Sequence, residues 1–369
     1  MANDETDALA DLLPPLLQAF EVLFFVSRHF HPPYLGQVLA AIGTPDTGLK
    51  DARARSQEWI AGMGELGAAL GAAADAALGA FAGLREAADG GGDIRRAFGA
   101  LRFVPKGLEA LYPLARLLPP VNRFFLDPAL RSDAALHALY LQPPHENTGV
   151  MQFAPEGSEE ERGSFWLYVP EHYSPERAWP VVVAMHGGSG TGHQFLWSWL
   201  RDARSRGAIL AGPTSIGPTW ALTGDDVDTP NILRMLEIIR ANWNVDPARL
   251  LLTGMSDGGT FSYISGLEPG SPFTHLAPIS AAFHTLLAEM CDRDRVRGLP
   301  IHIVHGMLDW MFPAAMAREA ARSLTAAGAI VTYREIEDLS HTYPREMNAE
   351  ILAWMEGRGS PPSRGRQLS

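Results

Sequence analysis

Residues 250–260 read LLLTGMSDGGT, a short apolar run that passes directly into Gly-x-Ser-x-Gly and then into a predicted helix. A serine at such a turn takes a strained backbone conformation, which leaves its hydroxyl clear of the sheet edge. Gly254 and Gly258 flank Ser256 where side chains would collide as strand and helix cross. Because the chain contains 36 glycines, the motif alone also fits a glycine-rich turn with a surface serine. Its interpretation therefore depends on the partners that the chain offers to this serine.

A serine hydroxyl needs a base to remove its proton and an acid to orient that base. In doubly wound enzymes with a nucleophilic serine, these partners follow later strands in the order serine, acid, histidine. Asp309 comes just after the apolar run 301–304, and His341 lies on the loop after the last predicted strand. The order predicts a catalytic triad of Ser256, Asp309 and His341.

Other polar residues near these positions remain alternatives. Asp338 precedes the predicted histidine by three residues and is the main rival for the role of the acid. His302 and His305 lie in or beside a strand, where we expect them to pack or to hydrogen-bond a neighbouring loop. Glu335 and Glu337 are expected to face solvent.

Backbone N–H groups near the serine must stabilise the oxyanion that forms when it attacks. The glycine-rich stretch 185–190, MHGGSG, follows a central apolar strand and is expected to supply one donor. Gly188 is the first choice for this donor and Gly187 the alternative. The second donor is the N–H of Asp257, whose carboxylate is expected to point away and to favour the helix N-terminus. The spacing of these glycines fits no nucleotide-binding motif.

Composition limits the classes of partner. The chain has 369 residues, 46% of them hydrophobic and 20% charged, which suits a large α/β domain with a smaller one. A net charge of −12 argues against nucleic acid, because phosphate binding needs clustered Lys and Arg. The single cysteine, Cys291, excludes an internal disulfide. No zinc motif is present, and His186 and His193 lack a nearby acid cluster, so we expect neither a metal nor a cofactor.

The first residues predict neither a signal peptide nor a membrane span. Residues 1–5 are acidic where a signal peptide would be basic. The apolar run 12–26 is interrupted by Pro14, Pro15 and Glu21. A cytoplasmic location is the resulting expectation.

Residues 1–145 show no strand alternation and are predicted to form a helical domain of unknown role. Gly64, Ala68 and Gly71 would allow close helix contact within the Ala-, Gly- and Leu-rich segment 59–84. A buried helical hairpin is the main expectation for this segment, and contact with a membrane surface or with a second copy of the chain is the alternative. The other expected helices are 16–30, 93–98 and 108–118.

Residues 146–357 alternate between strand and helix patterns, which predicts a mostly parallel, doubly wound α/β sheet. The helix expected at 228–243 would have Asp228 or Thr229 as its N-cap. A tail at 358–369, rich in Pro, Gly, Ser and Arg, is expected to be disordered. The expected strands are 164–170, 181–185, 208–211, 250–255, 275–279, 301–304 and 330–336, with a further helix at 193–206.

Two runs, FWLYVPEHY at 165–173 and WPVVVAMHGG at 179–188, carry a family resemblance. Together with the triad they resemble the polyhydroxybutyrate depolymerase, feruloyl esterase and phospholipase/carboxylesterase group. The resemblance covers residues 150–356 and implies an α/β-hydrolase fold. Secreted members of the group have signal peptides and often disulfides, which this sequence does not show. The implied site residues are Ser256, Asp309 and His341 for the triad, and Gly188 and Asp257 for the oxyanion hole.

The resulting hypothesis is a serine carboxylic ester hydrolase that acts through an acyl-enzyme on short- to medium-chain acyl or aryl esters. A peptidase or thioesterase on the same fold, and a lipase at a membrane surface, are the alternatives. Since no long insertion can form a lid, residues 1–145 are expected to wall part of the cleft. Four aromatic residues are candidates for substrate contact, with core packing as the alternative for each: Trp197, Trp220, Trp310 and Phe312.

Overall fold

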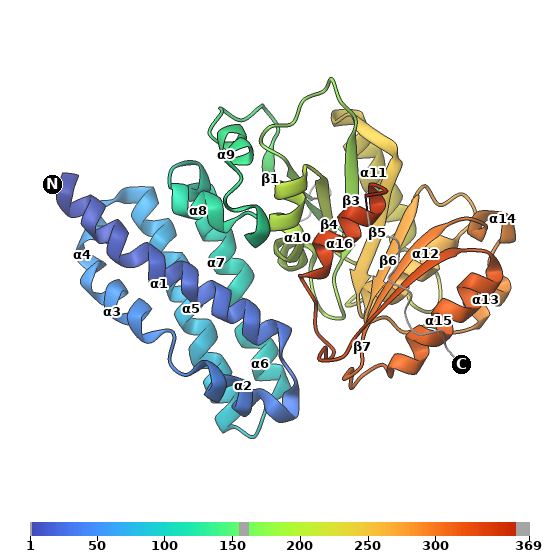
Figure 1. Ribbon diagram of the computed structural model, residues 1–369, viewed down its shortest axis with the longest axis horizontal. Helices are drawn as coiled ribbons and strands as arrows, with labels where there is room; N and C mark the ends of the chain where they lie inside the picture. Colours follow the sequence, from blue (N-terminus) through green and yellow to red (C-terminus); the bar gives the residue numbers. More distant parts are fainter. Residues whose placement is uncertain (1, 155–161, 359–369) are drawn as a thin grey trace. The chain divides into compact units, whose positions relative to one another are not determined.

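The computed structural model describes residues 2–154 and 162–358, and the chain divides into two compact units, Met1–Gln142 and Pro143–Ser369 (Figure 1). The first unit is helical, and the second carries the sheet. Apart from residue 358, the tail predicted to be disordered lies outside the described residues.

The second unit is built on an eight-stranded sheet with the order β1-β2-β4-β3-β5-β6-β7-β8. β1 and β2 pair antiparallel, as do β2 and β4, whereas every pair from β4 through β3 to β8 is parallel. This arrangement is that of an α/β-hydrolase, and the predicted fold class is confirmed. The strands are β1 (Gly149–Phe153), β2 (Phe165–Val169), β3 (Trp179–Met185), β4 (Ile209–Pro213), β5 (Val245–Met255), β6 (His275–Ile279), β7 (Pro300–Gly306) and β8 (Ile330–Ile336).

Helices cover both faces of the sheet, which explains why every residue of β3 is buried. Val181 and Val183 share one core cluster with residues of α11, α12 and α15. On the opposite face α10 packs against α16, where Asn348 donates a hydrogen bond to the carbonyl of Ser198 (2.8 Å). The helices are α10 (Gly192–Arg206), α11 (Asp228–Asn242), α12 (Asp257–Leu267), α13 (Leu286–Met290), α14 (Arg293–Val296), α15 (Ala314–Ala327) and α16 (Met347–Met355).

The start of α11 differs from the prediction. Asp226, and not Asp228 or Thr229, caps this helix, because its carboxylate accepts hydrogen bonds from the N–H groups of Asp228 (3.1 Å) and Thr229 (2.9 Å). The Asp228 carboxylate instead accepts from the N–H groups of Ile216 and Ala221, at 2.8 Å each. It therefore anchors the loop between β4 and α11, which runs toward the carboxyl end of the sheet.

The first unit packs its helices around α5, a single helix of 26 residues where a hairpin was expected. Close contact occurs at Gly107 in α7, where a Cβ would lie 2.5 Å from Phe20 Cζ and 3.1 Å from Ala76 Cβ. α1 begins well before the predicted start and contains Pro14 and Pro15. The helices are α1 (Ala2–Arg28), α2 (Leu35–Ile42), α3 (Thr47–Arg55), α4 (Gln57–Gly62), α5 (Gly64–Asp89), α6 (Ile94–Leu101), α7 (Phe103–Leu111), α8 (Pro119–Phe124) and α9 (Ala134–Tyr140), with short 3₁₀ turns at Pro32–Tyr34, Tyr112–Arg116 and Pro128–Leu130.

Two helices of this unit are long and apolar enough to cross a membrane by length and composition alone. They are Ala8–Arg28 and Gly64–Asp89, with mean hydropathies of 1.6 and 1.4 over windows that are 39% and 50% buried. The core helix of a globular unit passes the same test, so these two helices are weak evidence for a membrane span.

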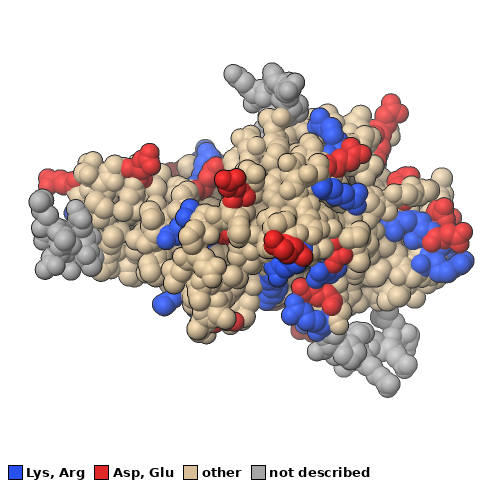
Figure 2. Space-filling model, turned by 90° about the horizontal axis from the view of Figure 1, so that it is seen from above, with Lys and Arg blue, Asp and Glu red and all other residues tan. Residues whose placement is uncertain are grey.

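On the molecular face shown in Figure 2, Lys and Arg side chains lie among Asp and Glu side chains.

Candidate active site

Ser256 occupies the sharp turn between β5 and α12 that the sequence predicts. Its φ is +56°, in a region of backbone conformation that residues other than glycine rarely adopt. A Cβ on Gly254 would lie 2.5 Å from the carbonyl carbon of Gly258, and a Cβ on Gly258 would lie 2.5 Å from the carbonyl oxygen of Met185. Only glycine allows the strand, the turn and the helix to approach so closely.

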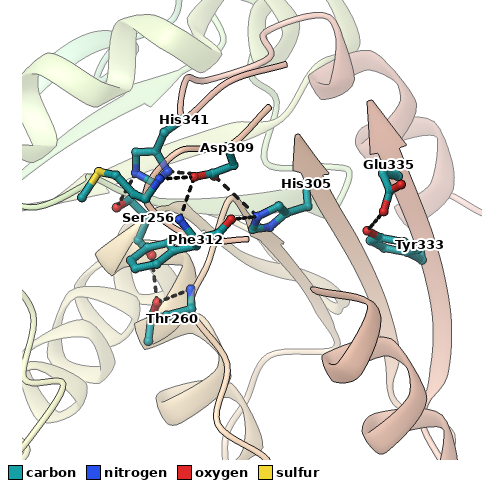
Figure 3. Close-up of polar contacts among 10 residues, drawn as sticks. Ser256, Thr260, His305, Asp309, Phe312, Tyr333, Glu335 and His341 are labelled. Atoms are coloured by element: carbon teal, nitrogen blue, oxygen red, sulfur yellow. Dashed lines mark hydrogen bonds and ion pairs between the residues drawn. The ribbon is translucent and has the colours of Figure 1, made fainter. Parts of the chain in front are cut away.

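Hydrogen bonds to the next strand hold this turn in place. The Ser256 N–H donates to the carbonyl of Ile279 at the end of β6 (2.9 Å). Thr260 donates from its hydroxyl to the Ser256 carbonyl (3.1 Å) and accepts from the N–H of Ala282 (3.0 Å), as Figure 3 shows in part. The backbone of the serine is therefore fixed from two sides.

The structure brings the three predicted triad residues together in one hydrogen-bonded chain (Figure 3). His341 Nε2 lies 3.0 Å from Ser256 Oγ, and His341 Nδ1 lies 2.8 Å from Asp309 Oδ2. An ionised carboxylate only accepts hydrogen bonds, so Nδ1 carries the proton and Nε2 is free to accept the proton of the serine. The three side chains come from the loops after β5, β7 and β8, which end at the same edge of the sheet.

The surroundings of Asp309 favour its charged form. Its Oδ1 atom accepts hydrogen bonds from the N–H groups of Met311 (2.9 Å) and Phe312 (2.8 Å). Burial raises the pKa of Asp309, but the hydrogen bonds from His341 and the Phe312 N–H outweigh burial, and the net pKa lies below the usual value. Asp309 is therefore ionised at neutral pH, although it is only 9% exposed.

The rival residues have other surroundings. Asp338 and Glu337 are exposed. Glu335 was expected to face solvent but is partly buried, because Arg318 binds it with two hydrogen bonds of 2.7 and 2.8 Å. His302 is buried with its Nε2 3.6 Å from a carboxylate oxygen of Glu350 in α16.

The glycine-rich loop after β3 lies beside Ser256. A Cβ on Gly187 would be 3.6 Å from Ser256 Cβ, and a Cβ on Gly188 would be 2.7 Å from Asp257 Oδ2. Within residues 2–154 and 162–358, the N–H groups of Gly188 and Asp257 donate no hydrogen bond. The Asp257 carboxylate does not simply point away, as expected, because it lies against Gly188 and accepts a hydrogen bond from Thr219 Oγ1 (2.5 Å).

A buried histidine braces this loop, a role that the sequence did not reveal. Burial lowers the pKa of His186 to about 4, so the ring is neutral at pH 7. Its Nε2 accepts from the N–H of Ser215 (3.1 Å), which leaves Nδ1 to donate to the carbonyl of Gly187 (2.6 Å). The His186 carbonyl accepts from Trp220 Nε1 (2.8 Å). The loop is thus fixed at its first residues.

Two of the four aromatic candidates lie beside the triad, and two do not. The ring of Phe312 meets that of His341 edge-on at 5.3 Å between centroids, and Trp310 does so at 6.0 Å. Trp220 and Trp197 are only 3% and 2% exposed, so the expectation that they contact substrate gives way to the alternative of core packing. The Trp220 ring stacks on Phe261 of α12 at 5.4 Å.

The loop that carries Asp309 also exposes apolar side chains that the sequence analysis did not single out. Met307, Leu308 and Met311 are 48%, 52% and 47% exposed, and Trp310 between them is 40% exposed. The result is an apolar surface next to His341.

Among the described residues, no group of three or more His, Cys, Asp or Glu side chains could hold a metal ion.

No protein-family model matches the chain. It is 24% identical over 225 residues to a bifunctional acetylxylan esterase/xylanase of Neocallimastix patriciarum, which covers 53% of this chain and 31% of that protein. It is 24% identical over 145 residues to a probable feruloyl esterase C of Aspergillus terreus, which covers 37% of this chain and 52% of that protein. The chain thus spans about a third and about half of the length of these two relatives.

Solved structures of esterases are similar to the chain. A thermostable esterase shares 20% identity, with a TM-score of 0.47, over 56% of this chain and 62% of that one. A thermophilic esterase of the Planctomycetes species Thermogutta terrifontis shares 19% identity, with a TM-score of 0.43, over 54% and 91% of the two chains. The curated relatives, together with the sheet topology, confirm the predicted resemblance to serine esterases on the α/β-hydrolase fold.

Proposed function

We propose that this protein is a serine carboxylic ester hydrolase that works through an acyl-enzyme. The observation that carries the proposal is the hydrogen-bonded chain from Ser256 Oγ through His341 to Asp309, with separations of 3.0 and 2.8 Å. The names of the two curated relatives, an acetylxylan esterase and a feruloyl esterase, support an ester as the substrate.

In the first half of the reaction, His341 Nε2 takes the proton of Ser256 as Oγ attacks the ester carbonyl. The ionised Asp309 keeps the proton of His341 on Nδ1 and stabilises the imidazolium that forms. The N–H groups of Gly188 and Asp257 are the proposed donors to the oxyanion, each worth on the order of 3 kcal/mol of transition-state stabilisation. His341 then gives its proton to the alcohol, which leaves.

In the second half, a water molecule loses a proton to His341 and attacks the acyl group on Ser256. The serine recovers its proton as the carboxylic acid departs, so the site returns to its starting state. The strained turn at Ser256 supports this cycle because it holds Oγ at the same place in both halves.

The apolar surface around Trp310 and Phe312 supports esters with an apolar acyl or aryl group as substrates. These rings flank His341, where the group that receives its proton must lie. We therefore infer short- to medium-chain acyl esters or aryl esters. The same surface gives no support to a charged substrate.

The direct test replaces the nucleophile. We expect Ser256→Ala to lose turnover of p-nitrophenyl acetate, propionate, butyrate and octanoate by a factor on the order of 10⁶. Ser262→Ala is the matched control, because Ser262 is buried in α12, the helix that follows Ser256, and among the described residues its hydroxyl bonds only the carbonyl of Gly259 (2.6 Å). A fluorophosphonate should label the wild type and Ser262→Ala but not Ser256→Ala. Turnover in Ser256→Ala near that of the wild type would contradict the proposal.

The same proteins separate the remaining alternatives. Faster turnover of a thioester or a peptide than of the oxygen ester with the same acyl group would reassign the enzyme to a thioesterase or a peptidase. The length and apolar composition of the helices Ala8–Arg28 and Gly64–Asp89 are the reason to test one further candidate, a lipase at a membrane surface. Flotation of the full chain with liposomes, together with higher activity on emulsified than on dissolved ester, would support it.

A further inference from the structure

His305 lies near the end of β7, on the strand that leads to the loop of Asp309. It is completely buried. His302, three residues earlier, must point to the other face of the sheet, because successive side chains of a strand alternate. The two histidines of β7 therefore have different neighbours, and only His305 reaches the catalytic loop.

The ring of His305 binds this loop at one atom (Figure 3). Its Nε2 lies 2.8 Å from the carbonyl oxygen of Phe312 and 3.5 Å from Asp309 Oδ2. A carbonyl oxygen only accepts hydrogen bonds, so Nε2 must carry the proton. Among the described residues, His305 Nδ1 has no hydrogen-bond partner, which agrees with a neutral ring protonated at Nε2.

The charged groups around His305 leave this hydrogen bond undisturbed. Glu335 is its neighbour across β7 and β8, but the Glu335 carboxylate is held by Arg318 and by the hydroxyl of Tyr333. Burial lowers the pKa of His305, against smaller opposing effects of the Phe312 carbonyl and Asp309. The ring is therefore neutral at pH 7.

Phe312, whose carbonyl binds His305, also holds Asp309 in place. The Phe312 N–H donates to Asp309 Oδ1, while Asp309 Oδ2 accepts from His341. A shift of the Phe312 backbone would thus change the direction of the carboxylate and, with it, the ring of His341 against which the Phe312 side chain packs. The other hydrogen bonds between this loop and the sheet hold its first residues, where the N–H groups of Leu308 and Asp309 donate to the carbonyls of Leu339 (3.0 Å) and Gly306 (3.4 Å). The bond from His305 holds the loop at its other end, at Phe312.

We propose that His305 is a positioning residue of the esterase reaction: its Nε2–H holds the turn 309–312 so that Asp309 faces His341. The proposal rests on the proposed function, because it assigns His305 a role in the same triad. His305 touches neither the serine nor the substrate, and it acts through the Phe312 carbonyl. Loss of the hydrogen bond should therefore lower kcat and leave substrate binding nearly unchanged.

Three variants of the full chain test this role. Gln at position 305 places an amide N–H near the position of Nε2, Asn places it one bond too short, and Leu removes it. We expect His305→Asn and His305→Leu to lower kcat for p-nitrophenyl acetate on the order of 10²-fold, as misplaced catalytic groups do. KM should change by less than about threefold. His305→Gln should recover most of the loss.

His302→Leu is the matched control, since His302 is a buried histidine of the same strand that faces Glu350 of α16 on the other side of the sheet. Its kcat should stay within about twofold of wild type. Melting temperatures show which variants are folded, and if His305→Leu does not fold, the comparison of Asn with Gln decides. Equal kcat values in His305→Asn, His305→Gln and the wild type, with Ser256→Ala inactive, would overturn the positioning role alone. Wild-type turnover in Ser256→Ala would overturn both proposals.

Discussion

Asp309 is a buried carboxylate that accepts hydrogen bonds at both of its oxygens. Oδ1 faces two backbone N–H groups, and Oδ2 faces His341. Because each oxygen has donors, the site favours the ionised form despite burial. The charge in turn decides which nitrogen of His341 carries the proton, and therefore whether Nε2 can act as a base.

Asp309→Asn tests this dependence on charge. The amide oxygen of Asn can still accept from Met311 and Phe312, but its NH₂ group would face Nδ1 of His341 and force that nitrogen to accept. The proton then sits on Nε2, so we expect kcat for p-nitrophenyl acetate to fall by about 10⁴-fold with the fold intact. Asp338→Asn, at the exposed rival carboxylate, is the control and should retain wild-type kcat. The reverse ranking would make Asp338 the acid.

At the residue scale, the sequence order was enough to pick out the three residues that the structure joins in one hydrogen-bonded chain, because strand ends in this fold meet at one edge. It was not enough to predict burial. Trp220 and Trp197 follow or lie within predicted elements near the loops, but their rings turn into the core. The hydrogen bond from Trp220 to the His186 carbonyl spans 34 residues, and no local pattern encodes such a contact.

At the scale of elements, the crossing of β5 and α12 depends on glycine. We expect Gly254→Ala to destabilise the protein by about 3 kcal/mol or more, because its Cβ would overlap backbone atoms that cannot move aside. Gly99→Ala is the opposite control, since Gly99 lies in α6 with nothing within 4 Å of the added Cβ. It should stabilise by about 0.5–1 kcal/mol. Urea unfolding of the three proteins measures both effects, and equal stabilities would contradict the close approach.

Central strands were predictable because they are continuous apolar runs, as in β3. The edge strand β1 (Gly149–Phe153) was missed, since it is only partly buried and its sequence GVMQF has little apolar–polar alternation. The start of α1 was also missed. Pro14 and Pro15 predict a helix boundary, but the buried residues Leu12, Leu13 and Leu16 around them outweigh the cost of the lost hydrogen bonds.

At the scale of the whole molecule, buried histidines make stability depend on pH. Burial lowers the pKa of both His186 and His302 from 6.5 to about 4. As the pH falls below 6.5, the unfolded chain binds protons at these sites before the folded protein does. The contribution of these two histidines to the free energy of unfolding is therefore complete above about pH 6.5 and is lost progressively as the pH falls to about 4.

We expect the melting temperature of the wild type to fall between pH 7 and pH 4.5. In His302→Leu the fall should be smaller than in the wild type by roughly 5 °C. His302→Leu removes one of the groups that gain a proton on unfolding, which is why its melting temperature should change less with pH. Differential scanning calorimetry at several pH values provides the measurement. An unchanged dependence on pH in His302→Leu would show that this ring has the same pKa in the folded protein as in the unfolded chain.

The division into units 1–142 and 143–369 leaves one prediction open. The hypothesis that residues 1–145 wall the cleft remains a prediction. Its physical basis is the sheet unit, in whose described residues, 143–154 and 162–358, no long insertion separates the strands.

The triad joins side chains that are 85 and 32 positions apart in the chain. The proposed ester turnover can therefore return after denaturation only when β5, β7 and β8 have reached their final register. The hydrogen bonds inside each helix of the first unit join residues only four positions apart, so they form faster. Recovered catalysis would thus mark the completion of refolding, after the helical circular dichroism signal has already returned.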